Sequence, residues 1–451
     1  MATRVAEHRS VYAALLALVW PVLIEQFLIL LVGLSDMLLA GYYLERPHLA
    51  AMAMLSYLLW ALENLFAVVA IGALAMTARF AGAGDDEGAC RVTNQAFVLG
   101  AVLAVGATVA GLIGIPVVVR AMQLASPADA LAVRYMYWVM PLVPAMMFEA
   151  VGIACLRGVG DMKTALAARL VVNVVDIAVS WSLLLGLGPL PKLGWDGLAI
   201  GTGCGYGLGG LLLLAVLLRG RRGLQIRWSL LRPDLDLMRR ILRIGVPGGF
   251  DIMSVIGCQL LFVSLINRLG ELATAALGVA IRVESLAYMP GTAFQVAAAT
   301  LAGQFLGARD FRRATDSVVA ACLACGAVML TAGVGFYYGA EWLAQLFVGT
   351  GHPDVVAAAA PLLRIVSVAM LPLGLMMVLS GALRGAGDTR WPLVFTLVGF
   401  LAVRLPLTYW LAIHLEWGIV GAWYAMVVDL LFRCALVVYR FWHGGWKRIE
   451  V

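Results

Sequence analysis

The sequence contains very little charge. Only 13% of its 451 residues are Asp, Glu, Lys or Arg, and 63% are hydrophobic, whereas a soluble globular domain carries roughly 25% charged residues. A water-soluble core of this size cannot bury so much apolar surface, which excludes a soluble protein. Apolar stretches of about 20 residues, the length that crosses a bilayer as a helix, recur along nearly the whole chain. They show no alternation with a period of two residues, so strands are excluded and an all-α integral membrane protein is predicted.

The sequence also lacks the motifs of catalysis and of ATP binding. It has no HExxH, no GxSxG, no acidic pair of the DDxxD kind within a span, and no GxxxxGK[ST] loop. Its five histidines are scattered through tails and loops: His8, His48, His352, His414 and His443. We therefore expect neither an enzyme nor an ATP-driven pump, and no cofactor. A membrane-embedded enzyme is the alternative from another functional class, and it would need a catalytic set at the membrane interface.

The apolar stretches predict about twelve transmembrane helices, each near the length that a bilayer requires. They lie near residues 12–40, 49–76, 92–119, 130–156, 164–187, 195–219, 240–267, 273–306, 314–347, 355–383, 391–413 and 417–441. With this count, the arginine-rich loops all fall on one side, and the opposite loops carry few cations. The positive-inside rule then places both termini in the cytoplasm, and we expect a multi-pass protein of the cytoplasmic (inner) membrane. The net charge of +6 reflects this orientation and does not indicate nucleic-acid binding.

An internal repeat divides the chain into two similar halves. Pro21 and Glu25 match Pro247 and Asp251 at an offset of about 226 residues. The run GAGD at 82–85 matches GARD at 307–310, and LRGVGD at 156–161 matches LRGAGD at 383–388, at nearly the same offset. Each half holds six predicted spans, an even number, so the two halves share one orientation and form a parallel repeat with a pseudo-two-fold axis along the membrane normal. We expect an N-lobe over 1–219, a basic cytoplasmic linker over 220–238 and a C-lobe over 239–451.

These motifs together resemble the multidrug and toxic compound extrusion (MATE) family over nearly the whole chain. The resemblance is carried by Pro21, Glu25 and Asp36, by TAR at 77–79 before GAGD, by the two LRGxGD runs, and by RVES at 282–285 before MPG at 289–291. It implies two six-helix lobes and export of small molecules driven by Na⁺ or H⁺. In this family the substrates are often amphipathic organic cations.

Ionisable residues inside a span are costly and mark functional candidates. Asp36 lies in the middle of the first span, with no cation within a helical turn. Asn173, Asp176 and Ser180 share a face of the fifth span, and Thr202 lies in the sixth. Some family members build a cation or proton site from the span-one Asp, an Asn and an Asp four apart on span five, and a span-six Thr. Here the matching span-five positions hold Asp176 and Ser180. The resemblance therefore leaves two alternatives open: the site binds Na⁺ at Asp36, Asp176 and Thr202, or it binds a proton.

The second half offers a less complete site. Asp251 is the repeat partner of Glu25, and the resemblance implies an acidic group at this C-lobe position. Span ten contributes no carboxylate of its own. Glu284 is expected to reach another helix, and Arg404 in span eleven is its candidate counter-charge. Asp251, Glu284 and Arg404 are therefore predicted as a coupling site or a substrate contact.

The sequence thus predicts a monomeric secondary active exporter. It would move small, amphipathic or cationic organic compounds across the lipid bilayer by antiport against Na⁺ or H⁺. The alternative within transport is a flippase for a lipid-linked precursor from the same wider superfamily. Such flippases often have additional spans and a markedly basic cleft, and this chain shows neither clearly.

Overall fold

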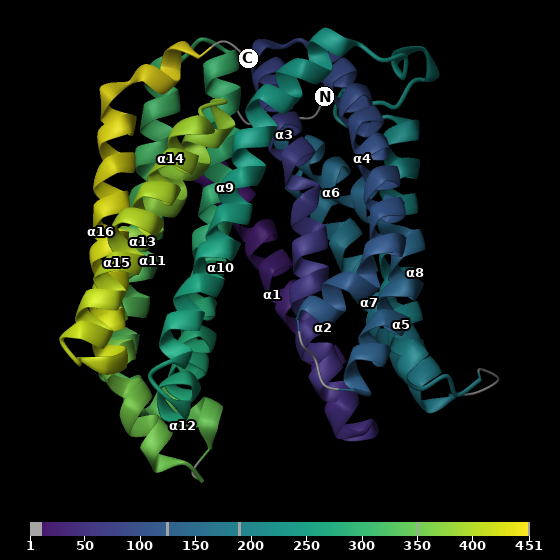
Figure 1. Cartoon of the computed structure of the whole chain (residues 1–451). Helices are drawn as coiled ribbons and strands as arrows, with labels where there is room; N and C mark the ends of the chain where they lie inside the picture. The colour runs from purple at the N-terminus through teal and green to yellow at the C-terminus, as the bar shows by residue number, and fades with distance from the viewer. Residues whose placement is uncertain (1–10, 123–125, 188–190, 350, 450–451) are drawn as a thin grey trace. The chain divides into compact units, whose positions relative to one another are not determined.

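The computed structural model describes residues 11–122, 126–187, 191–349 and 351–449. Within these ranges every regular element is a helix, and the β-type pairing is limited to one isolated bridge between Arg221 and Leu224. Eleven of the described helices are long and apolar enough to cross a membrane, or twelve if one bent pair counts as a single span. The predicted all-α membrane fold is confirmed (Figure 1).

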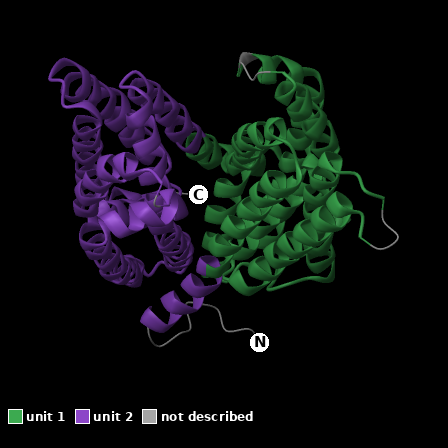
Figure 2. Ribbon diagram, turned by 90° about the horizontal axis from the view of Figure 1, so that it is seen from below, with its two compact units in different colours: residues 1–2, 24–249 green, residues 3–23, 250–451 purple. Residues whose placement is uncertain are grey.

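The chain forms two compact units (Figure 2). Of the described residues, unit 1 comprises 24–249, and unit 2 comprises 11–23 and 250–449. The boundaries fall inside two long helices, α1 (Val11–Tyr43) and α9 (Leu235–Asn267). The predicted lobes divide the chain at 220–238 instead, and that division stays a prediction.

Unit 1 contains most of α1 and seven further helices of the first half. These are α2 (Arg46–Leu65), α3 (Ala67–Ala83), α4 (Asp86–Ala121), α5 (Ala128–Val139), α6 (Val143–Gly158), α7 (Met162–Leu185) and α8 (Trp195–Arg219), with short 3₁₀ turns η2 (Met140–Leu142) and η3 (Trp228–Leu230). The helices α2 and α3 form the bent pair, with an angle of 40° at Phe66. The predicted span 130–156 is built from α5, η2 and α6, where Pro141 and Pro144 interrupt regular hydrogen bonding.

Unit 2 contains the helices of the second half. These are α10 (Glu271–Gly307), α11 (Phe311–Tyr338), α12 (Ala340–Val348), α13 (Pro353–Gly385), α14 (Arg390–Val398), η4 (Gly399–Arg404), α15 (Leu405–Thr408), η5 (Tyr409–His414), α16 (Gly418–His443) and η6 (Gly445–Arg448). The predicted span 314–347 is shorter in the structure, because the chain breaks at Gly339 and continues as the separate helix α12. The span 390–414 contains two π-helical turns, η4 and η5, around Pro406.

The repeated glycine motifs form the same turn in both units. Gly160 and Gly387 have φ values of 82° and 85°, a left-handed conformation that glycine adopts without a steric penalty. The next residue in each run, Asp161 or Asp388, donates its backbone N–H back to the carbonyl of Leu156 or Leu383, each at 2.8 Å. Such hydrogen bonds close a helix end, which explains why α6 and α13 stop at these motifs.

The charged residues of the motifs form equivalent ion pairs in the two units. Arg157 donates to Glu25 at 2.6 Å in unit 1, and Arg384 donates to Asp251 at 2.6 Å in unit 2. The motif aspartates also have arginine partners: Asp161 accepts from Arg221 at 2.7 Å, and Asp388 accepts from Arg440 at 2.8 Å. The LRGxGD runs therefore join the first and fourth spans of each half, and they also bind Arg221 just after α8 in unit 1 and Arg440 on α16 in unit 2.

Candidate functional site

Asp36 is buried in unit 1 on α1, with 8% of its surface exposed. Its Oδ1 atom has no hydrogen-bond partner among the described residues. A carboxylate in this position requires a proton or a cation, because an uncompensated charge inside a membrane protein is costly. Asp36 interacts electrostatically with Asp176 of α7, so the structure brings together the two acids that the sequence singled out.

Asp176 accepts hydrogen bonds from hydroxyl groups on two helices, α7 and α8. Its Oδ1 atom accepts hydrogen bonds from Ser180 Oγ at 3.1 Å and from Thr202 Oγ1 at 3.4 Å. Asp176 is 2% exposed, Ser180 is 0% exposed and Thr202 is 4% exposed. Water is therefore largely excluded, and these hydroxyls are the direct partners of the carboxylate.

Tyr135 of α5 extends this group and was not predicted from the sequence. Its hydroxyl lies 2.9 Å from Thr202 Oγ1, and its ring is completely buried. The charges of both Asp36 and Asp176 act on the Tyr135 hydroxyl. In the sequence, Tyr135 is visible only as a tyrosine inside an apolar span. That position indicates a buried side chain, but it does not identify Thr202 as the residue that the hydroxyl contacts.

Asn173 lies one helical turn before Asp176. It is 5% exposed, and its side-chain Nδ2 has no hydrogen-bond partner among the described residues. The candidate coupling site is thus Asp36, Tyr135, Asn173, Asp176, Ser180 and Thr202. Its potential ligands are carboxylate, hydroxyl and amide oxygens, which suit a hard cation such as Na⁺. The same two carboxylates also suit a shared proton.

Close packing of α7 against α8 produces this arrangement. Glycines recur at every fourth position of α8, and their absent side chains let the backbones approach. A Cβ atom on Gly205 would lie 2.7 Å from the carbonyl oxygen of Val172 and 3.0 Å from Asp176 Cβ. The glycine spacing at 197, 201, 205 and 209 was a readable signal for this contact.

The candidates of the second half are arranged differently. Asp251 is 1% exposed and lies against Arg384 rather than beside a second acid. Glu284 is 7% exposed and lies in the electrostatic field of Arg404. Arg404 itself donates to Asp429 at 2.8 Å, and its guanidinium lies 4.4 Å from the centre of the Phe400 ring.

Asp429 also accepts two hydrogen bonds from Arg433, at 2.8 and 2.9 Å. Asp429 and Arg433 are four residues apart and form an intrahelical ion pair on α16. The roles predicted for Asp251, Glu284 and Arg404 stay predictions. Of these three residues, the structure brings Glu284 and Arg404 together, whereas Asp251 pairs with Arg384.

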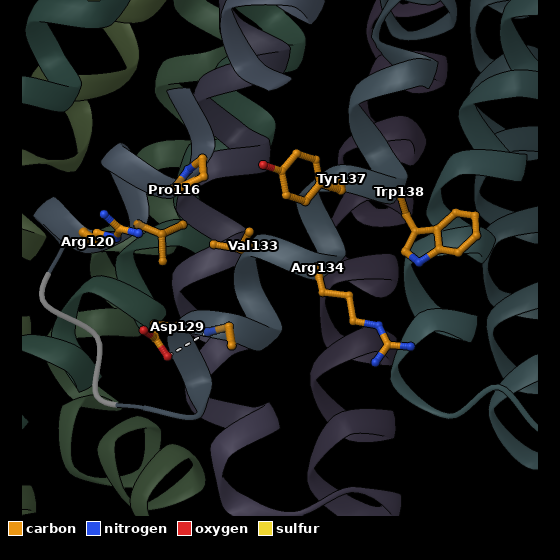
Figure 3. Close-up of a pocket in the computed structure, with 9 residues that line it drawn as sticks. Pro116, Arg120, Asp129, Val133, Arg134, Tyr137 and Trp138 are labelled. Carbon is orange, nitrogen blue, oxygen red and sulfur yellow. Dashed lines mark hydrogen bonds between the residues drawn. The ribbon is translucent and has the colours of Figure 1, made fainter. Parts of the chain in front are cut away.

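A separate cavity lies elsewhere in unit 1. It has a volume of about 710 Å³ and lies between the end of α4 and α5 (Figure 3). Arg120, Asp129 and Arg134 line it together with Tyr137 and Trp138. None of the predicted coupling residues is among its lining residues, so its size does not identify the coupling site.

The chain matches the MatE family in two segments, residues 21–182 and 247–410. These segments begin at Pro21 and Pro247, the first anchors of the internal repeat. A probable multidrug resistance protein NorM of Thermotoga maritima is 24% identical over 97% of this chain and 93% of its own length. A probable multidrug resistance protein YoeA of Bacillus subtilis is 25% identical over 100% of this chain and 97% of its own length.

Solved structures share the fold. A crystal structure of MATE in the bent conformation aligns with a TM-score of 0.89 at 22% identity, covering 96% of both chains. An outward-facing multidrug resistance MATE family transporter of the MOP superfamily aligns with a TM-score of 0.89 at 21% identity, covering 97% of this chain and 96% of its own. The family resemblance and the prediction of a transporter rather than an enzyme are confirmed: the chain belongs to the MatE family.

Proposed function

We propose that this transporter exports small, amphipathic or cationic organic compounds by antiport against Na⁺ or H⁺. The buried pair Asp36 and Asp176, with hydroxyls from Ser180 and Thr202, is the single observation that carries this proposal. The names of the multidrug resistance relatives support the substrate class. By the positive-inside rule the protein lies in the inner membrane with both termini in the cytoplasm, and it works as a monomer.

The coupling step follows from the repulsion between the two carboxylates. Two like charges repel each other more strongly inside a protein than in water, because the interior has a lower effective dielectric constant. A proton or Na⁺ at Asp36 removes this repulsion and favours a closer packing of α1 against α7 and α8. A full switch between two conformations requires about 5.5 kcal/mol of differential binding, and relief of this repulsion contributes to it.

The test is dye efflux from proteoliposomes under an imposed Na⁺ gradient and then under an imposed pH gradient. Asp36→Asn keeps the shape of the side chain and removes its titratable charge, so we expect it to insert normally and to lose gradient-driven efflux. Asp251→Asn should reduce coupling less, because Arg384 already neutralises that carboxylate. Asp196→Asn is the matched control in unit 1, since this acid of α8 pairs with Arg134 and lies outside the candidate site.

Three results would contradict the proposal. Full coupled efflux by Asp36→Asn would remove this residue from the mechanism. Efflux that ignores both gradients in the wild-type protein would exclude cation antiport. Translocation of a lipid-linked precursor without dye efflux would favour the flippase alternative instead.

A further inference from the structure

A second group of charged side chains lies inside unit 1, and the proposed coupling site does not use it. Three carboxylates from three helices lie near the guanidinium of Arg169 on α7: Glu149 of α6 at 3.2 Å, Glu25 of α1 at 3.7 Å and Glu63 of α2 at 3.9 Å. Arg157 of α6 completes the group through its 2.6 Å hydrogen bond to Glu25. We call these five residues the Arg169 cluster.

The charges of the Arg169 cluster do not balance. Three carboxylates face two guanidinium groups, so the fully ionised cluster carries one excess negative charge. Tyr206 of α8 donates a hydrogen bond to Glu63, but a neutral hydroxyl does not change the charge count. An uncompensated charge away from water is costly, and a buried carboxyl group avoids that cost by binding a proton.

Glu149 is the carboxyl group with the weakest compensation. It is 1% exposed, and its Oε1 atom, although 3.2 Å from Arg169 Nε, has no hydrogen-bond partner among the described residues. Glu25 has the closer contact with Arg157, while Glu63 has the Tyr206 hydroxyl and a side chain that is 34% exposed. The charged groups that act on Glu149 are Arg169, Glu63, Glu25 and Arg157.

The geometry favours a proton over a metal ion. The three carboxylates approach one another around Arg169, so a guanidinium already occupies the place where a metal ion would sit. The buried groups of unit 2 provide a contrast. Asp251 pairs one-to-one with Arg384, and Glu284 and Asp429 face Arg404 and Arg433. Those two groups balance, so the excess acid is a property of unit 1.

We propose that Glu149 holds a proton in the Arg169 cluster, as a second protonation site of unit 1 distinct from Asp36 and Asp176. The proposal does not depend on whether the transport cycle uses Na⁺ or H⁺. Binding and release of this proton change the charge that joins α1, α2, α6 and α7.

Infrared difference spectroscopy tests this directly, because protonated and ionised carboxyl groups absorb separately. The purified full-length protein in lipid nanodiscs is titrated through neutral pH. We expect a contribution to the protonated-carboxyl signal that remains in Asp36→Asn and disappears in Glu149→Gln, whether or not Asp36 itself holds a proton. Glu341→Gln is the control, because this exposed acid of α12 pairs with Arg364 and its loss should leave the signal unchanged.

A second variant keeps the proposal testable if Glu149→Gln does not fold. Glu63→Gln removes one negative charge at a partly exposed position, which balances the cluster and lets Glu149 ionise, so the signal should again disappear. An unchanged signal in folded Glu149→Gln, or in Glu63→Gln, would overturn the proposal. Since the readout is spectroscopic, this result is separate from any failure of cation-driven efflux.

Discussion

The residues around Asp176 form a connected set of hydrogen bonds from α5 to α7. Tyr135 contacts Thr202, and Thr202 together with Ser180 contacts Asp176. Helical spacing alone predicted that Asn173, Asp176 and Ser180 share a face. It could not predict Tyr135, because periodicity identifies the face that a residue occupies and not the side chain opposite it.

The Thr202 hydroxyl should contribute directly to cation or proton binding at Asp176. Thr202→Val keeps the shape of the side chain and removes the hydroxyl, leaving Tyr135 and Asp176 each without this partner. One hydrogen bond contributes about 1 kcal/mol, so we expect the apparent affinity for the coupling ion to fall roughly five-fold. The measurement is initial efflux rate against Na⁺ concentration or pH, and Thr202→Ser should restore it.

At the scale of elements, glycine on α8 determines how closely the site helices approach. Gly201 packs against Ser180, and Gly205 packs against Val172 and Asp176. Side chains larger than hydrogen at these positions would separate the Thr202 hydroxyl from the Asp176 carboxylate. The position of the site therefore depends on residues that have no functional group.

Gly205→Ala should accordingly disturb both packing and coupling. The added methyl group overlaps the Val172 carbonyl, and overpacking of this kind typically costs about 1–3 kcal/mol. We expect a lower thermal unfolding temperature and slower coupled efflux. Gly207→Ala on the same helix is the matched control, because a Cβ atom there meets nothing within 4 Å. Equal behaviour of the two variants would contradict this account of the α7–α8 contact.

At the scale of the whole molecule, the sequence predicted the all-helical fold, the repeat and its anchors, because span length, charge and motif offsets are local properties. The 40° bend at Phe66 and the π-helical turns around Pro406 were not predicted. Both depend on how neighbouring helices pack, which a single sequence does not reveal. The Arg169 cluster was missed for the same reason, since its members come from four helices.

The segment that connects the halves is attached more firmly than its basic composition suggested. Gln95 of α4 donates to the carbonyls of Leu230 and Arg232 at 2.7 and 2.8 Å, and accepts from the Asp234 N–H at 2.9 Å. Asn94 donates to the Gln225 carbonyl at 2.8 Å and accepts from the Arg227 N–H at 3.0 Å. Two buried amides of unit 1 thus satisfy five backbone groups of the predicted linker.

Removing these two amides should release the segment. In the double variant Asn94→Ala, Gln95→Ala the carbonyl and N–H groups of residues 225–234 lose their partners on α4, and the backbone becomes available to a protease. We expect trypsin to cut at Arg227 and to yield two fragments of similar size, whereas the wild-type protein resists cleavage there. Ser182→Ala is the control, because the Ser182 hydroxyl donates to the Ala178 carbonyl of its own helix and does not contact the connecting segment. Cleavage of wild type and double variant at the same rate would show that these hydrogen bonds do not hold the connection, and that the basic segment is as free as its composition predicts.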